Sequence, residues 1–389
     1  MKYSTEQQSP VHSSRLVKRF PKVQHIVALL VLSGMSLNSV AQTLSLPCDE
    51  AEEKVKAQTS EDEVALISAF QPARPLKRID PDYPVEAAKR GQEGWVQMSY
   101  VIDEEGRVQD PVIEDFSGSR AFKRKALNAI KRWTFEPAMK DGKPTQQCHQ
   151  AVQFDFALGG KRGATRSFIK KYKEIDAVYR TGNFAKADEA LLRLKDDNTL
   201  NRYENAWLWN LDAQIASGLK DWSRELSSYS RMLPSHRGIG KGDNVFGDEH
   251  IAFVHQRMGL IASQLGQFAN ALTYFDRLAA MENQQKRLEE IKPLVEEINA
   301  HINSDTALNI PVTIGEQGSW FHTLIRNQFA FANIEGELDT VEVRCESHRE
   351  KFTVAEDHIW QIPPSWGQCR VLVEGKDSTR FNLVEIAGS

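Results

Sequence analysis

Residues 81–158 read PDYPVEAAKRGQEGWVQMSYVIDEEGRVQDPVIEDFSGSRAFKRKALNAIKRWTFEPAMKDGKPTQQCHQAVQFDFAL. Two prolines bracket Tyr83 and hold the backbone extended before a short helix that we predict over residues 85–90. Gly91 and Gly94 then let the chain leave that helix through a left-handed turn. Residues 95–102 alternate between apolar and polar side chains, which is the period of a strand with one buried face.

The second half of this stretch continues the pattern. A tight turn at residues 103–106 joins the first strand to a partner strand over residues 108–116. Apolar residues recur at helical spacing over residues 122–133 and predict an amphipathic helix. A Gly-Lys-Pro turn at residues 142–144 leads into a last alternating strand over residues 150–157. The order helix–strand–strand–helix–strand predicts a small antiparallel sheet with two helices on one side, in a chain of the α+β multidomain class.

Four signals in this stretch, in this order and spacing, resemble the C-terminal domain of the TonB energy transducers of Gram-negative bacteria. They are the Tyr83-Pro84 step, the Asp-x-x-Gly hairpin, the series Trp133-x-Phe135-x-Pro137, and the closing Phe154-x-Phe156. The resemblance is confined to residues 74–158 and implies that the last strand, Gln150–Ala157, is a sheet edge. It also implies that this edge captures an extended peptide of an outer-membrane receptor, or of another envelope protein, by strand addition.

The resemblance implies two groups of partner-binding residues. On the edge strand they are Gln150, Val152, Gln153, Phe154, Asp155 and Phe156, of which Gln153 and Asp155 face outward. Near the Tyr-Pro step they are Asp80, Asp82 and Tyr83. Some relatives carry glutamine before this step, where this chain has Asp80 and Asp82. Because a carboxylate accepts hydrogen bonds but cannot donate them, these residues cannot make the donor contact that a glutamine makes. The alternative is that another part of the protein covers the edge strand.

The first residues predict export. A basic segment precedes an apolar run at residues 26–37, which is shorter than the roughly 20 residues of a membrane-spanning helix. We therefore predict a signal peptide over residues 1–41, cleaved between Ala41 and Gln42, and a periplasmic location. The alternative is an inner-membrane anchor that leaves the chain facing the periplasm. The acidic segment at residues 42–73 lacks the proline-rich span of an energy transducer, so coupling to the proton-driven motor is not predicted.

Net charge and cysteine content limit the kinds of partner and site that the chain can have. The chain holds 49 basic and 53 acidic residues, a formal net charge of −4 that argues against nucleic-acid binding. It has four cysteines, and an even count in an exported protein favours disulfides. Cys345 and Cys369 both lie in the β-rich C-terminal region and are predicted to pair, which leaves Cys48 for Cys148. Two other pairings are possible, and no Cys-x-x-Cys spacing suggests a metal site.

Residues 165–305 show helical patterns without strand alternation. Three segments share a polar turn, then an aromatic residue, then small residues. The aromatics are Phe184, Trp222 and Phe268, 38 and then 46 residues apart. These segments resemble the helical hairpins of tetratricopeptide repeats, whose period is about 34. Stacked hairpins form a concave surface that binds peptides or proteins. The glycine-rich stretch at residues 234–248 is predicted to be a loop.

Residues 306–389 alternate again and predict a small β-sandwich or barrel. Their tryptophans Trp320, Trp360 and Trp366 suggest either a carbohydrate or peptide surface or, as is commoner for tryptophan, packing in the core. No nucleophile elbow, zinc motif or carboxylate pair at useful spacing occurs along the chain, so we predict neither an enzyme nor a cofactor. The oligomeric state is not predicted.

Two functions follow from these patterns. The first is a periplasmic TonB-family protein that binds envelope or outer-membrane receptor partners by strand addition, linked to TonB-dependent transmembrane transport. The alternative is a periplasmic scaffold whose helical repeats bind proteins without energy transduction.

Overall fold

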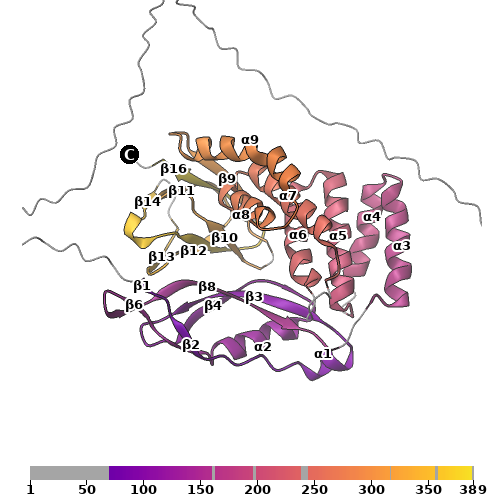
Figure 1. Ribbon diagram of the computed structural model, residues 1–389, viewed down its shortest axis with the longest axis horizontal. Helices are drawn as coiled ribbons and strands as arrows, with labels where there is room; N and C mark the ends of the chain where they lie inside the picture. Colours follow the sequence, from indigo (N-terminus) through magenta and orange to yellow (C-terminus); the bar gives the residue numbers. More distant parts are fainter. Residues whose placement is uncertain are drawn as a thin grey trace, which may run out of the picture. The chain divides into compact units, whose positions relative to one another are not determined.

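The computed structural model describes residues 70–159, 163–195, 199–237, 244–315, 317–354 and 358–387 (Figure 1). The predicted signal peptide, its cleavage site at Ala41 and Gln42, and Cys48 lie outside these residues. The described residues all belong to one compact unit that spans residues 65–389. A sheet domain comes first, a helical domain follows, and a small all-β domain, called the β domain below, ends the chain. This succession confirms the predicted fold class.

The sheet domain contains the predicted helix–strand–strand–helix–strand order. Its main elements are α1 (Val85–Lys89), β3 (Gly94–Ile102), β4 (Val108–Ser117), α2 (Arg120–Ile130) and β8 (Gln147–Phe156). The three long strands form one antiparallel sheet in the order β4-β3-β8. Shorter strands form two further small sheets, β1-β6-β7 and β2-β5, from β1 (Phe70–Gln71), β2 (Arg74–Lys77), β5 (Thr134–Glu136), β6 (Ala138–Lys140) and β7 (Lys143–Thr145). The central strand is therefore β3, and β8 is at one side of the sheet.

Helix α2 covers one face of this sheet with the apolar side chains that its periodicity predicts. Phe122, Ala126 and Ile130 are buried on α2, and the rings of Phe122 and Phe156 stack with centroids 4.3 Å apart. The predicted turn between β3 and β4 requires Gly106, which has a φ of +77°. A Cβ there would lie 1.8 Å from the Phe135 carbonyl oxygen, so the turn and the strand that contains Phe135 approach too closely for any other residue.

The sequence prediction that β3 buries only one face is wrong. Trp95, Ser99 and Val101 point away from α2 and are nevertheless buried. The reason is that helix α6 and strands of the β domain cover this second face. These elements lie more than a hundred residues further along the chain, so the local pattern carries no trace of them.

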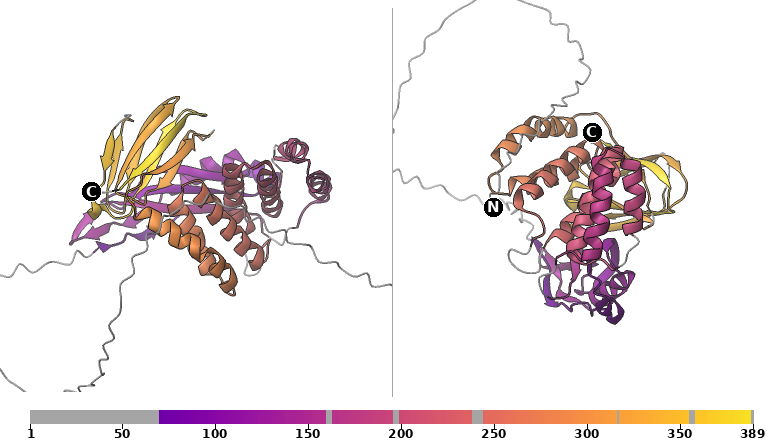
Figure 2. Two further views of the ribbon diagram at one scale, coloured as in Figure 1. Left: turned by 90° about the horizontal axis from the view of Figure 1, so that it is seen from above. Right: turned by 90° about the vertical axis from the view of Figure 1, so that its right-hand side faces the viewer.

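The helical domain consists of helices that lie side by side in sequence order (Figures 1 and 2). They are α3 (Arg166–Arg180), α4 (Phe184–Lys195), α5 (Arg202–Leu219), α6 (Trp222–His236), α7 (Asp248–Gln264), α8 (Phe268–Ala279) and α9 (Gln285–Ile302). Short turns join α3 to α4, α5 to α6 and α7 to α8, and the aromatics Phe184, Trp222 and Phe268 each begin the second helix of a pair. The three predicted hairpins are present, and their assignment to the tetratricopeptide class stays a prediction.

Two glycines let helices of this domain approach closely. A Cβ on Gly218 of α5 would lie 2.6 Å from the ring of Phe184 on α4, and one on Gly259 of α7 would lie 2.2 Å from the ring of Phe275 on α8. The predicted loop at residues 234–248 begins later than expected, because α6 continues through Pro234 to His236. The guanidinium of Arg202 donates to the carbonyl of Pro234 (2.6 Å), which satisfies an acceptor at this helix end.

The β domain is a sandwich of two four-stranded antiparallel sheets that share one apolar core. One sheet has the order β10-β15-β12-β13, from β10 (Ser319–Thr323), β15 (Arg370–Gly375), β12 (Leu338–Arg344) and β13 (Arg349–Phe352). The other has the order β14-β11-β16-β9, from β14 (Ile359–Gln361), β11 (Gln328–Glu335), β16 (Arg380–Ile386) and β9 (Leu308–Thr313). Trp360 is buried in this core, and Trp320 and Trp366 pack against it, so all three tryptophans have a packing role.

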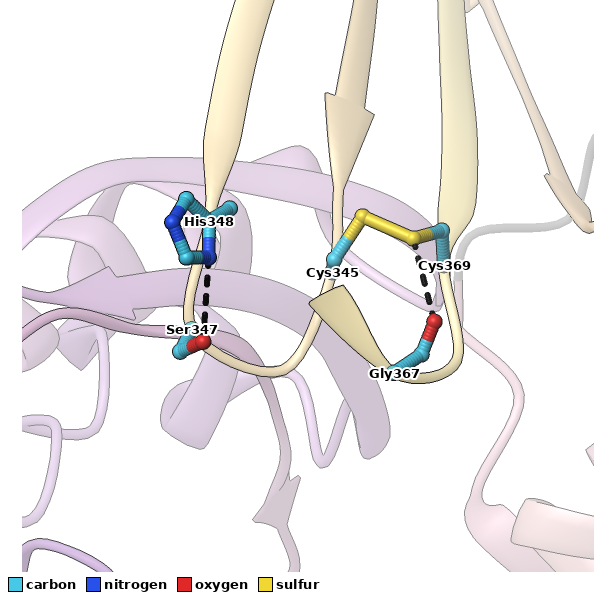
Figure 3. The surroundings of a disulfide bond; sticks show 5 residues. All are labelled: Cys345, Ser347, His348, Gly367 and Cys369. Atoms are coloured by element: carbon cyan, nitrogen blue, oxygen red, sulfur yellow. Dashed lines mark hydrogen bonds between the residues drawn. A yellow bond between two sulfur atoms is a disulfide. The ribbon is translucent and has the colours of Figure 1, made fainter. Parts of the chain in front are cut away.

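The predicted disulfide between Cys345 and Cys369 is present and joins the ends of β12 and β15 (Figure 3). Cys369 follows the 3-10 turn η1 (Pro364–Trp366). The imidazole of His348 lies beside this bridge in the β12–β13 turn and stacks on Trp366, with ring centroids 4.7 Å apart.

Candidate functional site

Strand β8 forms an edge of its sheet, as predicted. It pairs with β3 in antiparallel register, with Asp155 opposite Trp95 and Ala151 opposite Ser99. Among the described residues no strand pairs with its other side. At the start of β8 a neighbouring backbone lies against the strand, where the Cys148 N–H donates to the Glu346 carbonyl (3.2 Å). We call residues 150–156 the free edge.

The side chains of the free edge alternate as the sequence predicts. Val152, Phe154 and Phe156 pack into the core beneath α2. Gln153 and Asp155 face the opposite way, and both are already engaged inside the molecule. Gln153 donates to Asp155 (2.7 Å) and accepts from Gln97 (3.1 Å), and Asp155 also lies 3.3 Å from the Arg202 guanidinium. The Gln150 amide donates to the neighbouring carbonyl of His149 (2.9 Å). A partner would therefore meet the free edge mainly through backbone groups.

The Tyr-Pro step lies next to the end of β8. The Tyr83 ring packs edge-on against Phe122 and Phe156, with centroids 5.7 and 5.9 Å apart, and its hydroxyl donates to the Gln92 carbonyl. Asp80 and Asp82 are exposed, and Asp82 lies 3.3 Å from the Lys125 ammonium. The two predicted groups of partner-binding residues therefore touch where Tyr83 of one group packs against Phe156 of the other.

The second face of the sheet is acidic and is matched by arginines from the other two domains. Ion pairs between described residues cross this boundary, among them Asp110–Arg349, Glu114–Arg370 (2.8 Å), Asp115–Arg231 (2.9 Å) and Asp155–Arg202 (3.3 Å). The buried indole N–H of Trp95 donates to the Ser235 hydroxyl of α6 (2.9 Å). The sheet domain is therefore fastened to both other domains by specific polar contacts as well as by apolar burial.

A cavity of about 700 Å³, called the β8 hollow, lies between this second face and the helices. Strand β8 borders it with Ala151–Gln153, α7 with Asp248 and His255, α8 with Arg277, and the end of α6 with Arg237. A second cavity of about 840 Å³ shares with it the residues Gln97, Glu114, Ser230 and Tyr274 and reaches Trp320 and Phe381 of the β domain. The two cavities follow the sheet face towards the β domain.

The β8 hollow has an excess of positive charge. Arg237 and Arg277 are exposed at its border and have no carboxylate partner among the described residues, whereas Arg370 is paired with Glu114. Burial, together with the nearby Arg277 and Arg237, lowers the pKa of His255 to about 4, and burial likewise lowers the pKa of His236 to about 4. Both imidazoles are therefore neutral at pH 7. The His255 Nδ1 is buried and has no hydrogen-bond partner in the part of the chain that the structure describes.

Sequence reasoning missed the residues of this hollow. Arg237, His255 and Arg277 come from the helical domain, far along the chain from β8, and nothing in their local sequence marks them as neighbours of the sheet. Only the prediction that helical repeats form a binding surface pointed to this region.

The remaining cysteine is buried and unpaired among the described residues. Burial raises the pKa of the Cys148 thiol to about 11, so it is neutral at pH 7. Its predicted partner, Cys48, lies outside the described residues. Within those same residues, no cluster of three or more His, Cys, Asp or Glu side chains has an arrangement that could hold a metal ion. None of their helices combines the length and hydropathy that crossing a membrane requires.

Comparison with known proteins identifies the sheet domain. Residues 79–158 match the family described as Gram-negative bacterial TonB protein C-terminal. Protein TonB of Vibrio cholerae is 35% identical over 94 residues, a match that covers 24% of this chain and 35% of that protein. Protein TonB of Pseudomonas aeruginosa is 37% identical over 70 residues, covering 18% and 20% respectively. The chain thus spans about a third or less of the length of these curated relatives.

A solved structure gives a similar local match. The tonb2 protein from Vibrio anguillarum is 35% identical, and the match covers 28% of this chain and all of that chain, with a TM-score of 0.20. Residues 79–158 thus match the TonB C-terminal family, and this match covers only part of the chain.

Proposed function

We propose that this protein binds an extended segment of an outer-membrane receptor, or of another envelope protein, by adding it as a strand to β8. The observation that carries the proposal is the position of β8 at the edge of a sheet whose sequence matches the TonB C-terminal family. Backbone hydrogen bonds along such an edge supply affinity, and alternate side chains supply selectivity. We propose a role in receptor-linked transport on this basis.

The composition of β8 supports this use. Proteins usually protect an exposed edge strand with lysine or proline, which block or discourage pairing with another chain. Residues 147–156 read QCHQAVQFDF and contain neither. Because Phe154 and Phe156 are buried in the core, β8 is held extended in the absence of a partner. On binding, only the partner segment would lose conformational entropy.

A peptide-binding experiment tests this proposal. Fluorescently labelled peptides from the periplasmic N-terminal segments of outer-membrane receptors are titrated with the protein, and the tightest binder is made again with N-methyl groups on alternate residues. Strand addition predicts that one of the two N-methylated registers loses binding while the other keeps most of it. Equal binding of both registers and the parent peptide would contradict strand addition.

A protein variant gives a second measurement. Ala151→Pro removes a backbone donor at an exposed position of β8, and Gln109→Pro does the same at an exposed position of β4, the other outer strand of the sheet. We expect Ala151→Pro to abolish peptide binding and Gln109→Pro to retain it, with circular dichroism showing that both variants are folded.

We further propose that the protein acts in the periplasm. The support is the basic and apolar pattern of residues 1–41, followed by small residues before Gln42. N-terminal sequencing of the protein from cells tests this, with Gln42 as the expected first residue. An intact N-terminus would instead favour an inner-membrane anchor.

The scaffold alternative has one observation in its favour. Ile169 of α3, Leu192 of α4 and Phe253 of α7 are apolar side chains that remain at least 40% exposed on the helical domain. Under this alternative, Leu192→Ser and Phe253→Ser would remove a protein partner from pull-downs, while N-methylation of receptor peptides would have no effect on that partner.

A further inference from the structure

The β8 hollow lies where the side chains of an added strand would point. A strand that pairs with β8 would lie about 4.8 Å from it, and successive side chains of that strand would face opposite sides of the sheet. Those on the same side as Ala151 and Gln153 would face the hollow, because both residues border it. Its volume of about 700 Å³ holds more than one such side chain.

The charges around the hollow select among these side chains. Arg237 and Arg277 border it without a carboxylate partner among the described residues, and Arg370 is already paired with Glu114. The remaining carboxylate of the lining is Asp248, which is exposed where α7 begins. The lining therefore offers two arginines for an incoming anion and one carboxylate that opposes it.

We propose that the β8 hollow receives an acidic side chain of the polypeptide that adds to β8, with Arg237 and Arg277 as its binding residues. The proposal rests on strand addition to β8 as the protein's function. It assigns selectivity to the helical domain, while the sheet domain supplies the backbone pairing. The partner class is an extended segment with glutamate or aspartate at alternate positions.

The test uses two labelled ten-residue peptides, one of alternating valine and glutamate and one of alternating valine and glutamine. Both are titrated with the full chain and with the variant Arg237→Gln/Arg277→Gln. We expect the full chain to bind the glutamate peptide about tenfold more tightly than the glutamine peptide, because charge-assisted hydrogen bonds are the stronger kind. The double variant should bind both peptides with the affinity that the full chain has for the glutamine peptide.

A matched control separates this effect from a change of overall charge. The variant Arg166→Gln/Arg193→Gln removes two exposed arginines from α3 and α4, away from the hollow, and should keep the tenfold preference. Loss of the preference in this control, or its survival in Arg237→Gln/Arg277→Gln, would overturn the proposed site. If both peptides bind equally to the full chain, strand addition stands and the acidic selectivity is wrong. If neither peptide binds, the proposed function fails together with the inference.

Discussion

At the scale of single residues, a few buried polar groups join the domains. The Glu93 carboxylate accepts from the N–H groups of Leu158 (2.8 Å) and Arg202 (3.0 Å), so it lies at the N-terminus of α5. Negative charge is favourable there because the helix dipole and the unpaired N–H groups both attract it. At the other end of the helical domain, Arg326 donates to the carbonyls of Ile302 (2.9 Å), Ser304 (2.7 Å) and Thr306 (2.7 Å), just beyond α9.

Glu93→Gln should destabilise the protein by about 1–2 kcal/mol, because the amide loses one acceptor oxygen and the favourable charge at the start of α5. Chemical denaturation at pH 7 measures this. Glu86→Gln is the control, since Glu86 is exposed on α1 and its ion pair with Lys89 contributes little. If Glu86→Gln lowered the free energy of unfolding as much as Glu93→Gln, the stabilising role of Glu93 at the N-terminus of α5 would be contradicted.

Arg326→Met should cost about 2–4 kcal/mol, because several partly buried carbonyls around the end of α9 would lose their common donor. The midpoint of urea denaturation should shift down with an unchanged slope. A variant as stable as the parent would show that these carbonyls find other donors.

Two of the buried imidazoles, those of His236 and His255, make stability depend on pH. In the unfolded chain a histidine has a pKa near 6.5, whereas burial lowers the pKa of His236 and His255 to about 4 in the folded protein. Between these values the unfolded chain binds more protons, so the free energy of unfolding falls as pH drops from about 6.5 to 4 and is unaffected by these groups above that range.

We expect each of the two histidines to account for a loss of roughly 3 kcal/mol across this window. His255→Gln, which does not titrate, should remove about half of the decrease. The measurement is the free energy of unfolding of parent and variant at pH 7 and pH 5. If the free energy of unfolding fell by the same amount between pH 7 and pH 5 in the parent and in His255→Gln, protonation of His255 would not contribute to the pH dependence.

At the scale of elements, the sequence predicts what local patterns encode and misses what distant contacts impose. The alternation in residues 95–102 and 150–157 predicts β3, β8 and the α2-facing side of each. It does not predict that Trp95 is buried on the opposite side, because the covering groups come from α6 and the β domain. The hairpin turns were predictable because aromatic and small residues recur there. The end of α6 beyond Pro234 was not, and there the Pro234 carbonyl accepts from Arg202, a residue of another helix.

The packing of α4 against α5 depends on Gly218. Gly218→Ala places a Cβ 2.6 Å from the Phe184 ring, so one helix has to shift, and we expect a loss of about 1–3 kcal/mol. Gly159→Ala is the matched control, since a Cβ there meets nothing within 4 Å. Thermal denaturation of both variants measures the difference. Equal midpoints would show that Phe184 adapts without strain.

At the scale of the whole molecule, the candidate site belongs to more than one domain. Strand β8 was predictable from its own sequence, but the hollow beside it combines the sheet domain with α6, α7 and α8. The ion pairs Asp155–Arg202 and Glu114–Arg370 join segments far apart in the chain, and single-sequence patterns carry no information on such pairs. The isolated sheet domain would therefore expose Trp95 and an unbalanced acidic surface.

The pair between Glu114 and Arg370 is suited to a charge-reversal test of this coupling. Glu114→Arg places like charges together at a partly buried boundary and should destabilise the protein by about 1–3 kcal/mol. Adding Arg370→Glu restores opposite charges and should recover most of that loss. Failure of the double variant to recover would show that the two side chains do not interact across the domain boundary.

The disulfide between Cys345 and Cys369 affects how any segment could pair with β8. Glu346 directly follows Cys345, and its carbonyl already occupies the backbone N–H of Cys148 at the beginning of the strand. An added strand could pair with β8 towards Phe156, but beyond Cys148 the Glu346 backbone would block further pairing. Because the disulfide holds Glu346 in place, it would fix the register in which a partner strand pairs with β8.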